Sequence, residues 1–163
     1  MFLNIFMIFN VAFAASPFLN WKNFESSPSP KALVFISKNC PCSRAHIEHI
    51  KQISKNNPDL KVFAVATEPI KSQEALEYYK NVGLNVIKDD KHRLIKKYKA
   101  LKTPHLTLVN RGSVVYEGGV TNNISPKHAS KLYFKEVAFA LTEEKPLPFS
   151  KGRSLGCYIK RLK

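Results

Sequence analysis

The stretch ALVFISKNCPC, residues 32–42, places five apolar residues just before two cysteines that a single proline separates. An unbroken apolar run with β-branched and aromatic members is typical of a strand buried on both faces of a sheet. Pro41 suits the first turn of a helix, where its missing N–H group breaks no hydrogen bond. The run NNPD at 56–59 ends that helix. The stretch therefore predicts a buried strand, a cysteine loop and a helix reaching about residue 55.

Strand and helix patterns alternate along the rest of the chain. Apolar runs predict strands over residues 61–66, 85–87, 106–109 and 114–116. Apolar residues spaced by three or four predict helices over residues 72–81, 92–101 and 126–141. The turn NRGS at 110–113 predicts an antiparallel hairpin, because its glycine suits a tight turn. This order predicts an α/β domain in which helices flank a mixed central sheet on both faces.

The two ends of the chain differ in composition from this middle part. Residues 1–15 form an apolar run without a charged side chain and close on Ala12-Phe13-Ala14, the pattern of a secretory signal peptide. The run is shorter than the roughly 20 apolar residues of a membrane-spanning helix. We expect a signal peptide at 1–15, a linker at 16–30, one domain at 31–148, and a C-terminal tail at 149–163 that carries Cys157. The mature protein is then exported, to the periplasm or a similar compartment.

Length, composition and charge narrow the classes of function. A chain of 163 residues suits one compact domain, and 44% hydrophobic with 23% charged residues excludes disorder throughout. The formal net charge of +14 favours peripheral attraction to anionic surfaces or acidic partners. We expect no nucleic-acid partner, because the lysines are spread along the chain and no recognition motif accompanies them.

The three cysteines indicate thiol chemistry. Cys40 is predicted at the start of a helix, where free N–H groups, the helix dipole and the charges of Lys38 and Arg44 favour a thiolate. Cys42, one residue further in, is expected to be less exposed. In an oxidising compartment, an odd number of cysteines favours one pair with a free thiol, or alternating pairs.

Thr103-Pro104 stands just before a predicted strand. Proline permits the cis peptide bond that other residues resist. A cis bond here leaves the backbone of Thr103 free to pair with an incoming extended segment.

Two histidines offer a rival interpretation. His46 and His49 follow Cys42 at i+4 and i+7, on nearly one stripe of the predicted helix. With Cys40 or His105 as a further ligand, this set could hold a thiophilic metal such as copper or zinc.

The order of these motifs resembles the thioredoxin superfamily, and within it the redoxin branch related to the alkyl hydroperoxide reductase and thiol-specific antioxidant (AhpC/TSA) proteins. Over roughly residues 31–160, the matching features are NCPC at 39–42, Asp89 with Leu94 and Tyr98, Thr103-Pro104, VYEGG at 115–119, Lys145-Pro146 and GCYIK at 156–160. The resemblance implies a redox-active Cys40 with a cis peptide at Pro104 packed against it. Cys157 resembles a resolving thiol on a mobile tail, and the alternative for it is an inert, half-buried thiol.

Two departures from the family's cysteine motifs limit the functional conclusions that the resemblance supports. Thioredoxins and disulfide isomerases have two residues between their cysteines, whereas Pro41 alone separates this pair. Peroxiredoxins place proline and threonine before their reactive cysteine. Here Ser37 could stand in for the threonine, but Leu33 occupies the position of the proline. An antioxidant thiol peroxidase is therefore an alternative rather than the first prediction.

These observations predict an exported thiol-disulfide oxidoreductase. Cys40 attacks a disulfide, Cys42 or Cys157 resolves the adduct, and Thr103 and Pro104 bind the substrate. The partners are protein or small-molecule disulfides and thiols, together with an electron-donating redox protein. No organic cofactor is needed, because the cysteines themselves carry the electrons. The alternatives are a thiol peroxidase, a copper or zinc carrier, and a binding protein that has lost turnover.

Overall fold

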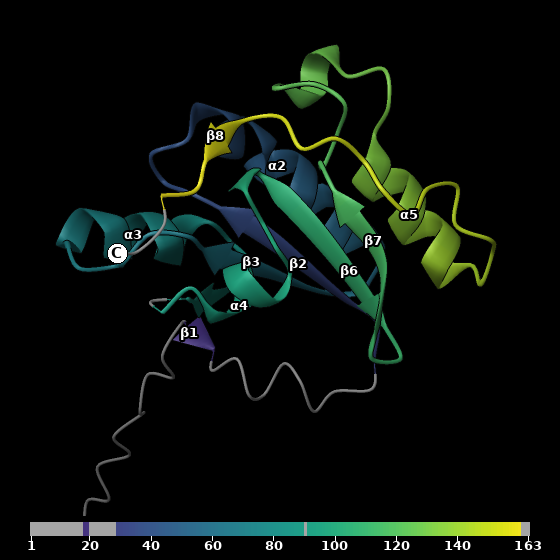
Figure 1. The fold of residues 1–163 in the computed structure, drawn as a ribbon, viewed down its shortest axis with the longest axis horizontal. Helices are drawn as coiled ribbons and strands as arrows, with labels where there is room; N and C mark the ends of the chain where they lie inside the picture. Colours follow the sequence, from purple (N-terminus) through teal and green to yellow (C-terminus); the bar gives the residue numbers. More distant parts are fainter. Residues whose placement is uncertain (1–17, 20–28, 90, 161–163) are drawn as a thin grey trace, which may run out of the picture.

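Strand β2 (Lys31–Ile36) lies in the middle of the fold. The computed structural model describes residues 18–19, 29–89 and 91–160 (Figure 1). The apolar side chains of β2 are fully buried, and strand alternation divides them between two cores. Ala32, Val34 and Ile36 belong to one core, and Leu33 and Phe35 belong to the other. A strand buried on both faces is what the unbroken apolar run predicts.

Six strands form the central sheet, in the order β1-β4-β3-β2-β6-β7. Their bounds are β1 Phe18–Leu19, β3 Lys61–Ala66, β4 Asn85–Lys88, β6 His105–Asn110 and β7 Ser113–Gly118, with β2 as above. Strands β1, β4, β3 and β2 pair in parallel, whereas β6 is antiparallel to β2 and to β7. Arg111 and Gly112 both have positive φ angles and form the tight turn between β6 and β7. The predicted mixed sheet and hairpin are confirmed.

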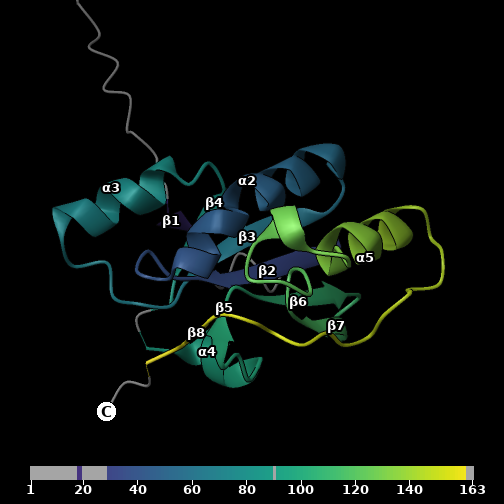
Figure 2. The same cartoon turned by 90° about the horizontal axis from the view of Figure 1, so that it is seen from above.

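Helices cover both faces of the sheet. Helices α2 (Pro41–Asn56), α3 (Gln73–Asn81) and α5 (Tyr133–Thr142) lie on one face, and α4 (Arg93–Lys97) lies on the other (Figure 2). Ile50, Tyr79 and Phe134 pack into the first core, and Leu94 and Ile95 pack into the second. The α/β fold class predicted from the alternating patterns is therefore confirmed.

Helix α4 is shorter than the predicted 92–101. His92 and Lys99 both have positive φ, which ends the helical conformation on either side of it. The Asp89 carboxylate accepts hydrogen bonds from the backbone N–H groups of Leu94 and Ile95, at 3.2 and 2.9 Å. This cap starts the helix after the position that periodicity alone suggested.

The predicted helix over 126–141 is broken into two parts. A 3₁₀ turn, η1 (Pro126–His128), precedes α5, which begins only at Tyr133. The side-chain oxygen of Asn122 accepts hydrogen bonds from the backbone N–H groups of Ser130 and Lys131, at 3.0 Å each. These side-chain hydrogen bonds satisfy the N–H groups of Ser130 and Lys131, which therefore need no helical hydrogen bonds.

The C-terminal tail lies against the domain when the Cys40–Cys157 disulfide is formed, and its mobility in the reduced protein stays a prediction. Gly152 donates to the Glu117 carbonyl at 3.0 Å, and Glu117 in turn donates to Ser150 at 3.1 Å. The tail then crosses the sheet end to form β8 (Cys157–Tyr158), which pairs with β5 (Lys102–Thr103) (Figure 1). Backbone hydrogen bonds thus hold the tail at both of its ends.

The predicted signal peptide at residues 1–15 lies outside the described residues. Within the segment predicted to be a linker, Phe18–Leu19 forms β1 and pairs with β4 at the sheet edge, so this part belongs to the fold. In the part of the chain that the structure describes, no helix combines the length and apolarity needed to cross a bilayer.

Candidate active site

Cys40 occupies the N-cap position of α2. Its φ and ψ of −97° and 112° are extended, Pro41 follows at the first helical position, and no side chain caps the helix end. The preceding loop is held by the Ser37 N–H group, which donates to the Ser43 hydroxyl at 3.2 Å. The positive end of the helix dipole is therefore presented to the sulfur of Cys40.

Cys40 is disulfide-bonded to Cys157, and their Cα atoms are 5.8 Å apart, a separation that disulfides commonly have. The Cys40 sulfur also lies 3.2 Å from the Thr103 carbonyl oxygen. The peptide bond between Thr103 and Pro104 is cis, as the resemblance implied. The structure thus brings Cys40, Cys157, Thr103 and Pro104 together, although they come from three distant parts of the sequence.

Cys42 is the free cysteine among the described residues. The sulfur atoms of Cys40, Cys42 and Cys157 all lie within 4.8 Å of one another. The expectation that Cys42 is less exposed than Cys40 is wrong: Cys40 is 1% exposed, whereas Cys42 is half-buried. The reason is tertiary, because β8 lies over Cys40 and leaves Cys42 at the margin.

Gly156 allows the tail to come this close. A Cβ atom at this position would lie 2.0 Å from the Thr103 carbonyl oxygen and 3.4 Å from the Cβ atom of Cys42. Its φ of +144° is also a conformation that other residues rarely adopt. In the sequence, GCYIK at 156–160 is informative only as part of the family resemblance. The glycine directly before Cys157 is the local feature that could have indicated this close approach.

The charges expected to flank Cys40 are only partly available to it. The Lys38 ammonium group pairs with Glu74 on α3 at 2.9 Å, and the Lys38 N–H group donates to the Glu68 carboxylate at 2.6 Å. Arg44 is exposed on α2. The N-terminus of α2 supplies positive potential to Cys40 without depending on Lys38.

The histidines of α2 do not join the sulfur cluster, so the predicted ligand set with His46 and His49 is wrong. His46 Nδ1 lies 2.8 Å from the Cys42 carbonyl oxygen, which can only accept, and Nε2 lies 3.0 Å from the Thr121 hydroxyl. Burial lowers the pKa of His46, and both of its ring nitrogens already have partners within the protein. His49 instead lines a groove beside Phe139 of α5.

His105 borders the tail rather than the sulfur atoms. Its Nδ1 lies 2.8 Å from the Ser154 hydroxyl, and its ring meets Phe35 edge-on. Burial lowers its pKa to about 4, although the negative charge of Glu117 acts in the opposite direction. His105 therefore stays neutral near pH 7 and ties the tail to the start of β6.

Comparisons with known proteins support this architecture. No protein-family model matches the chain, and no curated protein matches it. Among solved structures, an uncharacterized conserved protein from Geobacillus kaustophilus aligns with a TM-score of 0.72 and 20% identity, over 86% of this chain and 81% of that one.

Two further structures resemble the chain. A hypothetical protein from Sinorhizobium meliloti aligns with a TM-score of 0.68 and 22% identity, over 85% of this chain and 82% of that one. StoA from Bacillus subtilis aligns with a TM-score of 0.50 and 18% identity, over 58% of this chain and 75% of that one. At these identities the likeness concerns the fold, and the narrower resemblance to the AhpC/TSA branch stays a prediction. With Cys40 at the start of α2 and the cis-proline before β6, the chain has a thioredoxin-like α/β fold.

Proposed function

We propose that this protein is a thiol-disulfide oxidoreductase in which Cys40 and Cys157 form the working redox pair. One observation carries the proposal: Cys157 is bonded to Cys40 while its backbone pairs with Thr103, beside the cis-proline. A thiol at the end of a sheet, next to a helix N-terminus and to a strand edge that β8 of the same chain pairs with, suits exchange with an extended cysteine-containing segment.

The reaction proceeds in two exchanges. In the reduced protein, the Cys40 thiolate attacks one sulfur of the substrate disulfide, and the other substrate sulfur leaves as a thiolate. The Cys157 thiolate then attacks the Cys40 sulfur, closes the Cys40–Cys157 bond and expels the second substrate thiolate. Two electrons and two protons have passed from the two cysteines to the substrate.

Thr103 and Pro104 serve as the substrate-binding residues. In the structure the N–H and C=O groups at β5 pair with β8 of the same chain. A substrate segment can take this edge when Cys157 is reduced and the tail has moved aside. An exported location fits this chemistry, because disulfides persist outside the cytosol.

Insulin reduction in the presence of a thiol donor tests the proposal. Cys40→Ser should abolish the activity, and Cys157→Ser should trap a mixed disulfide between Cys40 and the substrate, detectable by mass spectrometry. Cys42→Ser is the matched control and should keep the Cys40–Cys157 couple. Activity of the Cys40→Ser variant equal to that of the wild type would contradict the proposal.

A second candidate function rests on the three clustered sulfur atoms. Thiolates select soft ions such as Cu(I) and Zn²⁺. The three sulfurs lie within 4.8 Å of one another in the disulfide form, and after reduction they could hold one such ion. The ligands would be Cys40, Cys42 and Cys157 in place of the histidines. Titration of the reduced protein with Cu(I) against a competing chelator should then give one ion per chain. Unchanged affinity in the Cys157→Ser variant would exclude this site.

A further inference from the structure

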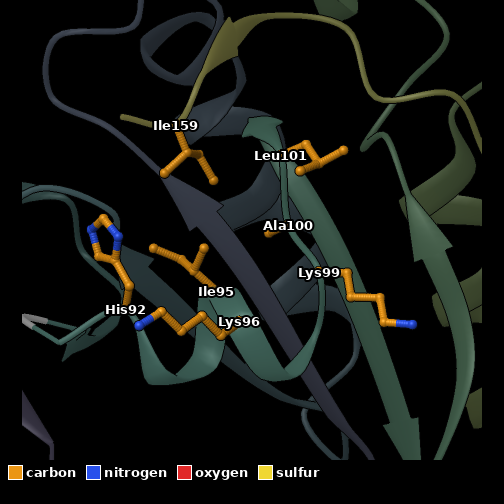
Figure 3. Close-up of a pocket in the computed structure, with 7 residues that line it drawn as sticks. All are labelled: His92, Ile95, Lys96, Lys99, Ala100, Leu101 and Ile159. Carbon is orange, nitrogen blue, oxygen red and sulfur yellow. The ribbon is translucent and has the colours of Figure 1, made fainter. Parts of the chain in front are cut away.

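An apolar pocket of about 510 Å³ lies beside the end of the tail, on the α4 side of the sheet. Most of its wall comes from α4 and the residue before it, from the loop after α4 and from the tail. These residues are His92, Ile95, Ala100, Leu101 and Ile159 (Figure 3). Lys96 and Lys99 complete the lining. None of these side chains has a role in the exchange of electrons described above.

The pairing of the tail with β5 determines which side chain reaches the pocket. Cys157 is the partner of Thr103, and the Ile159 N–H group continues the pairing by donating to the Leu101 carbonyl at 2.9 Å. Side chains two positions apart project from the same side of a strand. Ile159 therefore lies on the side of the reactive Cys157, and its side chain points toward Ile95 (Figure 3).

We infer that this pocket is a substrate subsite, which binds an aliphatic side chain two residues after the reactive cysteine of an extended peptide. The inference rests on the proposed function and adds a substrate class to it. The tail of the chain is the template, because it presents Cys157 to Cys40 and Ile159 to the pocket at the same time. In the oxidised protein the tail occupies the site that a substrate uses after reduction.

Two features favour an aliphatic occupant. Leu101 is 57% exposed although it is a large apolar side chain, so the wall of the pocket still has apolar surface to cover. Ile159 packs on the second core only in part, and the space that remains beside it admits a side chain as large or larger. The residue before the cysteine must be small in this register, because a Cβ atom at Gly156 would meet the Thr103 carbonyl.

The experiment uses the full chain with Cys42→Ser, Gly156→Ala and Cys157→Ser, which leaves Cys40 as the sole cysteine and lifts the tail from Thr103. The probes are two synthetic hexapeptides with the sequence of residues 155–160, LGCYIK and its aspartate counterpart LGCYDK. Each peptide is equilibrated with the glutathione mixed disulfide of Cys40, and mass spectrometry gives the exchange constant. We expect a constant about tenfold larger for LGCYIK, because its isoleucine is removed from water.

Two further variants test whether the difference between the exchange constants of the two peptides arises in the pocket. Leu101→Ser should reduce the constant of LGCYIK to that of LGCYDK. Ile124→Ser, at a residue that is 58% exposed and is not among those that line the pocket, should change neither constant. If both peptides exchange with constants within twofold of each other, the subsite is wrong and the oxidoreductase function stands. If neither the peptides nor glutathione bond to Cys40, the proposed function itself fails.

A second experiment uses a variant whose tail keeps Gly156 and Cys157, so its result does not depend on the folding of the triple variant. In a Cys42→Ser background, Ile159→Asp should shift the equilibrium of the Cys40–Cys157 disulfide with glutathione about tenfold toward the reduced form. An unchanged equilibrium would show that the pocket contributes nothing to the pairing and would overturn the inference.

Discussion

Thr103 and Cys157 are direct partners in an antiparallel strand pair, although they lie in different regions of the sequence. The pairing sets the Cys157 sulfur against Cys40, at the N-terminus of α2. The tail therefore makes with its own domain the contacts that we propose for a substrate. This relationship leads to the predictions that follow.

Replacement of Gly156 should loosen the tail. In Gly156→Ala the new Cβ atom would lie 2.0 Å from the Thr103 carbonyl oxygen, and the positive φ of this position adds strain. We expect the Cys40–Cys157 disulfide to become about tenfold to a hundredfold easier to reduce, since each 1.4 kcal/mol of lost pairing is a factor of ten. Equilibration with glutathione, followed by alkylation of Cys40, measures the change.

Gly112→Ala is the control for this prediction. Gly112 also has positive φ, but a Cβ atom there would meet nothing within 4 Å, and the residue lies in the turn between β6 and β7. It should lower the free energy of unfolding without altering the reduction of the disulfide. Equal effects of the two substitutions on reduction would contradict our account of the tail.

Alkylation should distinguish the three cysteines. Cys42 is free and half-buried, whereas Cys40 and Cys157 are bonded to each other. Iodoacetamide should therefore add one group, on Cys42, to the oxidised protein, and three groups after reduction and unfolding. Peptide mapping by mass spectrometry locates them, and a cross-link between Cys40 and Cys42 in the oxidised protein would show that the pairing is wrong.

Acid should destabilise the fold through His105. Burial lowers its pKa to about 4 in the folded protein, against about 6.5 when unfolded, so the unfolded chain binds more protons between these values. The contribution of neutral His105 to the free energy of unfolding is complete above about pH 6.5 and is lost as the pH falls toward about 4. Over this window we expect a loss of about 2 to 3 kcal/mol, measured by urea unfolding.

His105→Gln is the control, because glutamine does not titrate. Burial also lowers the pKa values of His46 and His49, so their loss of stability in acid should persist in this variant. The difference between the wild type and the variant in the pH dependence of the free energy of unfolding gives the contribution of His105. A pH dependence of unfolding that is identical in both proteins would refute its assignment.

The cap of α4 should be sensitive to substitution. The buried carboxylate of Asp89 accepts hydrogen bonds from the backbone of Leu94 and Ile95. Asp89→Ala leaves both N–H groups without this partner and should cost about 2 kcal/mol of the free energy of unfolding. Asp59→Ala, at an exposed position before β3, should change it by less than about 0.5 kcal/mol. Similar urea midpoints for the two variants would argue against the cap.

The order of the elements could be predicted from sequence because strand and helix patterns are local. The run at 32–36 and the turn at 110–113 predict β2 and the hairpin from the side chains of the segments themselves. Helix ends were less predictable. The apolar pattern over 92–101 predicts a longer helix than the observed α4. The helix is shorter because residues flanking it adopt positive φ and Asp89 supplies the cap from outside the helix.

Local patterns along the chain are enough to predict an α/β domain with a cysteine at the start of its first long helix and a proline before the hairpin. Which cysteine pairs with Cys40, which one is buried, and the fact that His46 and His49 face elsewhere depend on tertiary contacts. The pairing of Cys40 and Cys157 joins positions 117 residues apart. Such a contact depends on where the whole chain has already placed β5 and the tail, and no local pattern of side chains encodes that placement.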